Sequence, residues 1–124
     1  MKVNELDIIF AWFFFDEAQF SEKKIPNVNG KNRPCLVLES LMGGYRVAAI
    51  TSRHVSITGR IKKEAPFNES EAKKIGLKKA GCVLMNKRDI ICEADIKFVV
   101  GNISNAEDLL LRRLHQAAKE AELI

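Results

Sequence analysis

The sequence has few residues of the types that hold metal ions or cross-link chains. It contains two histidines and three cysteines, and no two cysteines have Cys-x-x-Cys spacing. An odd number of cysteines without such a pair argues against a disulfide framework and against a zinc site. All three lie in apolar, strand-like runs, so we expect small buried core side chains at Cys35, Cys82 and Cys92.

Long hydrophobic runs are also missing. The longest is Ile8–Phe15, far short of the roughly 20 apolar residues that cross a bilayer. The first residues, MKVNELD, include acids. No small-residue cleavage site follows the phenylalanine-rich run, so a secretory signal is not expected. We therefore expect a cytoplasmic protein that does not act at a membrane.

Several motifs of metal and nucleotide chemistry are absent. There is no Gly-rich phosphate loop ending in Lys-Ser or Lys-Thr, no His-Glu-x-x-His, no Gly-x-Ser-x-Gly and no cluster of acids at metal spacing. We therefore expect neither a metal nor another cofactor. A paired-histidine mechanism would need His54 and His115 to converge, and we place His115 at the surface, or at the edge of the apolar stripe, of a C-terminal helix.

The charge that is present is unevenly distributed. Residues 23–63 contain nine bases and one acid, which leaves 20 − 9 = 11 bases and 16 − 1 = 15 acids elsewhere. A segment of net charge +8 in a remainder of −4 is typical of a surface that binds phosphates. A solvated basic face is the alternative interpretation.

Short apolar runs between turn residues predict a mainly β domain. We expect strands at 7–15, 34–41, 45–52, 80–85 and 89–92. A tight turn at 42–44 should join the second strand to the third, and a turn at 86–88 the last two. Residues 16–32 predict a long functional loop, and 53–63 a basic hairpin or strand–loop element.

Two helices are expected. Asn68 can cap a short helix that has Glu71 at its third position and ends before Gly76. Ser104 and Glu107 match a capping box that would begin a helix over about 104–123. Its apolar stripe indicates packing on the sheet, or alternatively a partner-binding face, and consists of Leu110, Leu111, Leu114, Ala117, Ala118 and Ala121. Residues 93–100 predict two helical turns, with a strand as the alternative.

These elements predict one domain over residues 1–124. Six or so short strands without βαβ alternation indicate a mainly β, α+β fold. We expect a small SH3-like antiparallel barrel or half-barrel with short helices and a C-terminal α-helix.

The run KNRPCLVL, residues 31–38, places an arginine where a basic turn enters a strand. Pro34 holds the preceding residue in an extended conformation, so Arg33 should be fixed at the mouth of the strand. If the second and third strands pair, Thr51 should lie beside it. A guanidinium fork and a hydroxyl at one open end of a barrel suit a phosphate. An ion pair between Arg33 and an acid is the alternative.

The order of these segments resembles the MazF/PemK/Kid family of type II toxin–antitoxin ribonucleases. The matching segments are DIIFAWFFF, KNRPCLVL, VAAITS, GLKKAGCVLMNKRDI and VVGNIS, which together span roughly residues 7–114. The strand that begins with Arg-Pro, followed by the strand that ends in Thr-Ser, is the most specific part of the match.

The resemblance implies a homodimer that cleaves single-stranded RNA without a metal and that binds a cognate antitoxin. The ribose 2′-hydroxyl would attack the adjacent phosphate and leave a 2′,3′-cyclic phosphate. Arg33 would stabilise the phosphorane or protonate the leaving oxygen, and Thr51 would contact the scissile phosphate. We expect the RNA to be bound by Lys23, Lys24, Lys31, Ser52, Arg53, His54 and Arg60. His54 is also a candidate local base, with a solvent-facing loop position as the alternative.

The sequence departs from the family pattern at three positions. Leu84 and Asn86 stand where Kid-type members have an arginine and an aspartate, and Leu6 stands where the family has a glycine. A catalytically inactive relative that binds nucleic acid or protein through the same groove is therefore the alternative function.

Overall fold

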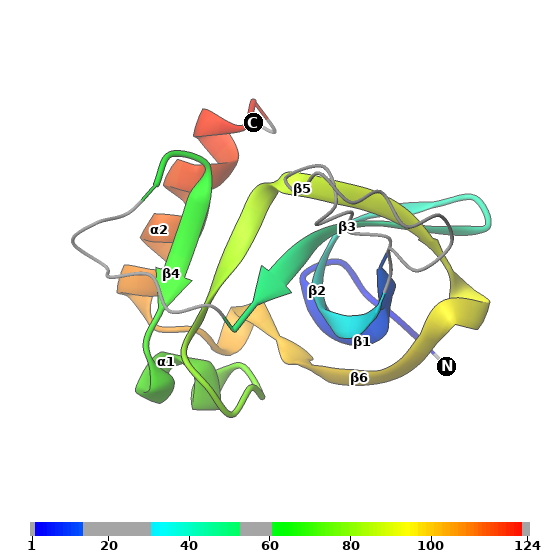
Figure 1. Cartoon of the computed structure of the whole chain (residues 1–124), viewed down its shortest axis with the longest axis horizontal. Helices are drawn as coiled ribbons and strands as arrows, with labels where there is room; N and C mark the ends of the chain where they lie inside the picture. The colour runs from blue at the N-terminus through cyan, green and yellow to red at the C-terminus, as the bar shows by residue number, and fades with distance from the viewer. Residues whose placement is uncertain (1, 14–30, 53–60, 123–124) are drawn as a thin grey trace, which may run out of the picture.

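The computed structural model of the protein describes residues 2–13, 31–52 and 61–122. Within these residues six strands form one antiparallel sheet, and two helices accompany it (Figure 1). The strands are β1 (Asp7–Phe13), β2 (Lys31–Leu41), β3 (Gly44–Thr51), β4 (Glu64–Phe67), β5 (Gly81–Cys92) and β6 (Ile96–Asn102). The helices are α1 (Glu69–Lys74) and α2 (Asp108–Glu120).

The sheet is coiled but does not close into a complete barrel. Its strand order is β4-β5-β3-β2-β1-β6, so β4 and β6 form the two edges. Figure 1 shows β3, β5 and β6 curling around the β1–β2 pair, while β4 lies apart from it beside α2. The predicted mainly β, α+β class is confirmed, and the barrel is a half-barrel because its edge strands do not pair with each other.

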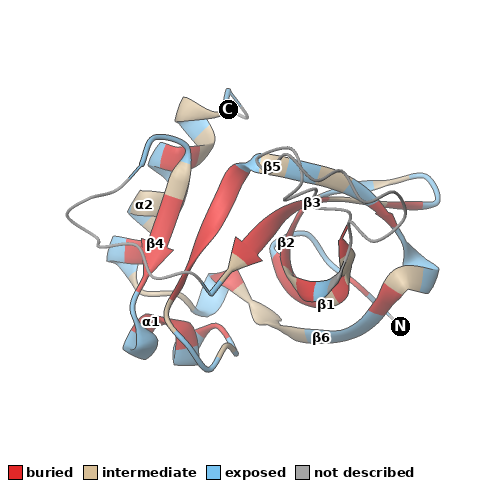
Figure 2. Ribbon diagram, in the orientation of Figure 1, coloured by how far each residue is buried: buried red, intermediate tan, exposed pale blue. Residues whose placement is uncertain are grey.

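Side chains alternate between two apolar clusters, one on each face of the sheet. The helix-side cluster combines alternate strand residues with the buried stripe of α2, and includes Leu36, Ala48, Ile50, Val83, Met85, Leu110, Leu114 and Ala117. The inner cluster contains the intervening strand residues, including Ala11, Phe13, Cys35, Val37, Val47, Ala49, Cys82 and Leu84. Figure 2 shows these buried positions along β3, β4 and β5. The α2 stripe therefore packs on the sheet, as the simpler interpretation predicted.

Helix α1 has both of its predicted end signals. Asn68 Oδ1 accepts a hydrogen bond from Glu71 N at 2.8 Å, and Glu71 Oε1 accepts one from Asn68 N at 3.0 Å. The helix ends at Ile75, and Gly76 follows with φ of +91°. Left-handed backbone at this position favours glycine and turns the chain out of the helix.

The buried carboxylate of Glu71 ties α1 to α2. Arg113 of α2 donates hydrogen bonds to Glu71 Oε2 and to the carbonyl oxygen of Pro66 in β4. The Glu71 side chain is 3% exposed, so the guanidinium supplies the counter-charge that a buried carboxylate needs. This single arginine therefore joins both helices to the edge strand.

The predicted capping box at Ser104 is wrong, and α2 begins four residues later than expected. The Ser104 amide donates instead to Asn102 Oδ1 at 2.7 Å, and residues 103–105 form a 3₁₀ turn. Glu107 is the N-cap residue but makes no side-chain cap hydrogen bond. Its carboxylate pairs with Lys74 of α1 at 2.5 Å. A local bond to Asn102 thus occupies the Ser104 amide, and a tertiary ion pair with Lys74 occupies the Glu107 carboxylate.

Residues 80–92 do not form two strands joined by a turn. They form one strand, β5, whose two halves both pair with β3. The register jumps from Ala49–Leu84 to Ala48–Arg88, so Met85, Asn86 and Lys87 bulge out of the ladder. The polar residues that suggested a turn mark this bulge instead, and the chain direction does not reverse.

Three other expectations need correction. Residues 96–102 form β6, which pairs with β1, so the strand alternative holds and the two helical turns do not, apart from a 3₁₀ turn at Glu93–Asp95. Cys92 is exposed, whereas Cys35 and Cys82 are buried as expected.

Strand β2 begins at Lys31 rather than Pro34, and the unforeseen strand β4 pairs with β5. Residues 14–30 and 53–60, predicted as a strand end and basic loops, lie outside the described residues.

None of the helices in the described ranges combines the length and the apolar character needed to cross a membrane.

Candidate functional site

Arg33 lies near the start of β2, on the inner face of the sheet. It pairs with Ala11 of β1, and Cys35 pairs with Ala49 of β3. Continuing the β2–β3 register by two residues places Thr51 opposite Arg33. Because side chains alternate along a strand, both share the face of Cys35 and Ala49. The apolar rows of β2 and β3 therefore end in a cation and a hydroxyl.

A pocket of about 350 Å³ opens at this end of the sheet. Its walls come from β2, β3, β4 and the loop between α1 and β5. The lining residues are Asn32, Arg33, Pro34, Ile50, Thr51, Ser52, Phe67, Leu77, Lys78, Lys79 and Ala80. This volume lies at the lower end of the range for small-molecule sites. Arg33, Thr51 and Ser52 thus all line one pocket, and the hairpin register had led us to expect Thr51 beside Arg33.

The guanidinium of Arg33 is held in a largely enclosed position. The residue is 6% exposed, and its Cζ atom lies 6.0 Å from the centroid of the Phe13 ring in β1. This distance is at the outer limit for attraction between a cation and an aromatic face. The carbonyl oxygen of Arg33 also accepts a hydrogen bond from Cys35 Sγ at 3.5 Å. Arg33 is therefore shielded from most water, with an aromatic ring of β1 on one side.

Cys35, two residues along β2, stays protonated at neutral pH. Burial raises the pKa of its thiol from 9.0 to about 12, although the Arg33 charge opposes this rise and Asp89 adds to it. A thiol with so high a pKa is a poor nucleophile. The chemistry of the pocket therefore has to come from the groups that line it.

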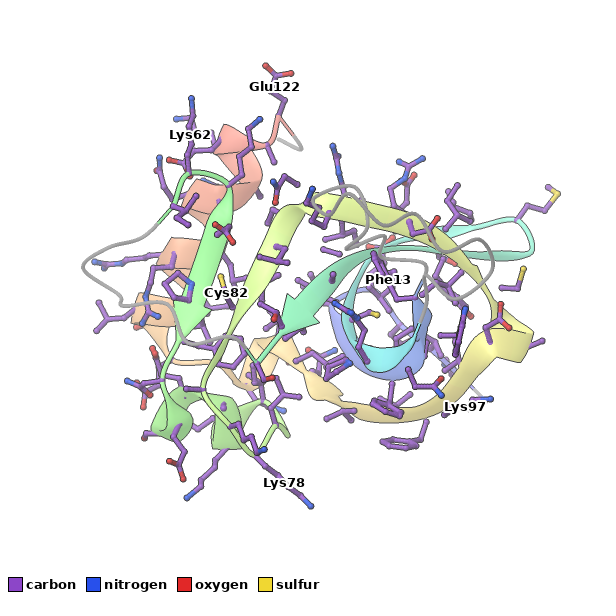
Figure 3. The ribbon with its side chains drawn as sticks, in the orientation of Figure 1. Phe13, Lys62, Lys78, Cys82, Lys97 and Glu122 are labelled. Atoms are coloured by element: carbon purple, nitrogen blue, oxygen red, sulfur yellow. The ribbon has the colours of Figure 1, made fainter. Side chains whose placement is uncertain are left out.

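Two cations of the pocket were not singled out by the sequence analysis. Lys78 and Lys79 lie in the loop between α1 and β5, and both line the pocket. Figure 3 shows Lys78 projecting outward from this loop. The β3–β5 pairing explains the arrangement, because Thr51 pairs with Cys82, close to the lysines in sequence. The two lysines stand in the motif GLKKAG, but their position at the pocket depends on the β3–β5 pairing, which the sequence analysis did not predict.

Most of the other predicted RNA-binding residues cannot be placed. Lys31 is the first residue of β2, two positions before Arg33. Five residues lie outside the described part of the chain: Lys23, Lys24, Arg53, His54 and Arg60. The exposed position predicted for His115 on the C-terminal helix agrees with the structure.

The two positions that depart from the Kid-type pattern lie away from the Arg33 pocket. Leu84 is buried in the inner cluster, where it pairs with Ala49 and Glu64. Asn86 is exposed on the β5 bulge, and it lines a second pocket of about 410 Å³ with Arg46, Arg88, Asp89 and Ile90. Neither residue lines the Arg33 pocket. No three histidine, cysteine or acidic side chains gather as a metal site across the ranges that the structure describes.

Comparisons with known proteins gave matches at the level of structure alone. No protein-family model matches the chain, and no curated protein matches its sequence. The toxin MazF-mt6 of Mycobacterium tuberculosis is 18% identical, with a TM-score of 0.59 over 95% of this chain and 97% of that chain. A mycobacterial endoribonuclease in complex with its cognate antitoxin is 8% identical, with a TM-score of 0.62 over 99% and 97%.

A further mycobacterial endoribonuclease is 8% identical, with a TM-score of 0.61 over all of this chain and 95% of that chain. The matches thus cover nearly the whole of both proteins, although little sequence is shared. The resemblance noted in the sequence is confirmed at the level of the fold. The chain has the fold of the MazF-like toxin endoribonucleases.

Proposed function

We propose that this protein is the toxin of a type II toxin–antitoxin system and that it cleaves single-stranded RNA in the cytoplasm without a metal ion. The observation that carries the proposal is the joint position of Arg33 and Thr51 at one pocket, in a chain with a MazF-like fold. Neighbours with that fold are named endoribonucleases.

The proposed reaction is a transesterification within the RNA. The 2′-oxygen forms a bond to phosphorus, the bond from phosphorus to the 5′-oxygen breaks, and a 2′,3′-cyclic phosphate remains. His54, the candidate base, would take the proton of the 2′-hydroxyl, and the departing 5′-oxygen gains a proton to become a hydroxyl. Negative charge builds on the phosphoryl oxygens midway, so fixed donors near them accelerate the step.

Arg33 suits the role of the charge-stabilising donor. Its fork can donate two hydrogen bonds to two phosphate oxygens, and it remains charged at any relevant pH. Its low exposure removes competing water, which strengthens its interaction with a developing charge. The Thr51 hydroxyl would hold the scissile phosphate beside it. If Arg33 also passes a proton to the leaving oxygen, it would regain one from water, so that it is charged before and after the step.

The proposed partners are single-stranded RNA, a second copy of the chain and an antitoxin. The basic segment of residues 23–63 would supply contacts to the RNA backbone through Lys23, Lys24, Lys31, Ser52, Arg53, His54 and Arg60. One neighbour was solved in complex with its cognate antitoxin, which supports a protein partner here.

Incubation of the purified protein with single-stranded RNA in excess chelator tests the activity. We expect fragments with 5′-hydroxyl and 2′,3′-cyclic phosphate ends. Arg33→Ala should lower the cleavage rate by roughly 100-fold or more, the usual loss when one oxyanion donor is removed. Arg46→Ala is the matched control, because the Arg46 side chain is 43% exposed, pairs with Glu39 at 2.8 Å and does not line the pocket. Intact RNA, or equal rates for wild type and Arg33→Ala, would contradict the proposal.

A catalytically inactive binding module is the second candidate. The observation that favours it is Leu84, an apolar buried residue where Kid-type members place an arginine. Such a module would bind RNA in a salt-dependent way and leave it uncut. The same incubation therefore separates the two candidates.

A further inference from the structure

We propose that Lys78 and Lys79 bind the RNA backbone phosphate next to the one held by Arg33, and that they set the affinity for RNA rather than the rate of cleavage. This inference rests on the proposed function, because it concerns how the same pocket holds its substrate. It assigns the α1–β5 loop as a substrate-binding element.

Arg33 and the two lysines all line this pocket, although they come from separate elements. Arg33 comes from β2, whereas the lysines come from the loop that precedes β5. A single phosphate on Arg33 and Thr51 would occupy the inner part of the pocket. The next phosphate of an extended RNA strand would then lie toward the rim, where the exposed lysines stand.

The lysines of α1 differ from those of the loop in their partners. Lys73 pairs with Glu69 at 3.4 Å, and Lys74 pairs with Glu107 at 2.5 Å. Across the part of the chain that the structure describes, no carboxylate lies within ion-pair distance of Lys78 or Lys79. The loop lysines are therefore available to an anionic ligand, whereas the helix lysines already have counter-charges.

The loop is anchored so that its lysines stay beside the pocket. Leu77 N donates to Ala72 O at 2.9 Å, and the Leu77 side chain packs against the helix-side cluster. Gly76 passes so close to β6 that a Cβ atom there would lie 2.4 Å from Val100 O. A fixed loop loses little conformational freedom when the ligand binds, which favours affinity.

The buried arginine and the exposed lysines have different roles. Arg33 is enclosed, which strengthens its interaction with charge that develops in a transition state. Lys78 and Lys79 are exposed, and hydrated ammonium groups bind phosphates mainly by releasing counterions. Contacts of this kind are made equally in the ground state and the transition state, so they lower KM and leave kcat unchanged.

The test compares Lys78→Gln/Lys79→Gln with Lys73→Gln/Lys74→Gln, which removes the same charge from the adjoining helix. A fluorescein-labelled single-stranded RNA of mixed sequence gives kcat and KM. The DNA of the same sequence gives Kd without cleavage, because it lacks the 2′-hydroxyl. The KM for the RNA and the Kd for the DNA are measured from about 0.05 to 0.3 M salt, because counterion release dominates binding over this range.

We expect the loop variant to bind the DNA roughly ten- to thirty-fold more weakly at about 0.1 M salt, and the slope of log Kd against log salt to fall by about 1.4. Its KM should rise while kcat stays at the wild-type value, and the helix variant should match wild type. An unchanged slope, or a loss of kcat at constant KM, would overturn the inference.

The outcomes also separate this inference from the proposed function. If the wild type binds the RNA and the DNA but does not cleave the RNA, the nuclease proposal fails, and the salt slope of the loop variant still decides the role of the lysines. If the loop variant binds normally while Arg33→Ala abolishes cleavage, the lysine inference alone is overturned. If the wild type binds neither strand, both fail.

Discussion

Leu6 occupies a backbone conformation that favours glycine. Its φ is +69°, and its side chain is exposed. Two hydrogen bonds hold the backbone there: Leu6 N donates to Val37 O at 2.8 Å, and Ile103 N donates to Leu6 O at 2.9 Å. In the family that the sequence resembles, a glycine stands at this position. A left-handed conformation costs a residue with a Cβ atom about 1–2 kcal/mol.

Leu6→Gly should therefore stabilise the fold. The relief of strain is partly offset by the greater freedom of glycine in the unfolded chain, so we expect a gain of about 0.5–1 kcal/mol. Urea unfolding followed by circular dichroism measures it. Leu6→Ala is the control, because it removes the exposed side chain but keeps the strain. A gain with alanine as large as with glycine would show that the side chain, not the backbone, was the cause.

Cys35 makes the stability depend on pH in the alkaline range. Its thiol has a pKa of about 12 in the folded protein because of burial, against an ordinary value of 9.0. Above pH 9 the unfolded chain loses this proton and the folded chain keeps it, so unfolding becomes easier as pH rises. The contribution is complete below about pH 9 and is lost progressively up to about pH 12.

Removal of the thiol should flatten this dependence. The free energy of unfolding of the wild type should fall more steeply than that of Cys35→Ala between pH 9 and 11, by up to about 1.4 kcal/mol per pH unit for one proton. Urea unfolding at several pH values measures the difference. Cys92→Ala, at the exposed cysteine, should keep the wild-type slope. Parallel curves for wild type and Cys35→Ala would contradict the assignment.

At the scale of elements, the end of α1 is fixed by a close approach to β6. Gly76 has φ of +91°, and a Cβ atom there would meet Val100 O. Gly101 of β6 makes the same close approach from the other side, because a Cβ atom on it would clash with Ile75 O. Two glycines thus let the helix end lie directly on the edge strand, and this contact positions the loop that carries the pocket lysines.

Gly76→Ala should destabilise the protein by more than its backbone conformation alone requires. Gly43 offers the matched control, because its φ is +84° but no atom lies within 4 Å of a Cβ placed on it. We expect Gly43→Ala to cost roughly 1 kcal/mol and Gly76→Ala at least about 1 kcal/mol more. Urea midpoints give both values. Equal losses would show that the contact with β6 relaxes freely.

Local sequence signals predicted some elements well and others wrongly. The capping box of α1 formed although Arg113 also binds Glu71, because Arg113 contacts Oε2 and leaves Oε1 to the Asn68 amide. The similar motif at Ser104 failed because Asn102 binds the Ser104 amide and Lys74 pairs with Glu107. The polar run in β5 was interpreted as a turn, but it is a bulge because both flanking segments pair with β3.

At the scale of the whole molecule, the Arg33 pocket exists only because four segments meet at one end of the half-barrel. The proposed toxin would use it to cut cellular RNA and arrest growth. Expression in a bacterium should therefore stop growth, and Arg33→Ala should restore it to the uninduced rate. Arg46→Ala should remain toxic, because Arg46 lies outside the pocket.

Growth curves after induction measure this effect, with protein levels and melting temperatures compared because Arg33 is buried. Equal toxicity of wild type and Arg33→Ala would contradict the catalytic role proposed for Arg33. A small interaction domain without nuclease activity would leave growth unaffected in all three strains.

The sequence alone predicted three features: the alternation of apolar residues, the hairpin at Met42–Gly44 and the entry of Arg33-Pro34 into a strand. Each of them depends on neighbours within a few residues. They sufficed for the fold class and for placing Arg33 near Thr51. The start of α2, the continuity of β5 and the arrival of Lys78 and Lys79 at the pocket depended on contacts between distant segments. Such contacts compete with local preferences for the same hydrogen bonds and charges, and the packed sheet decides which of them form.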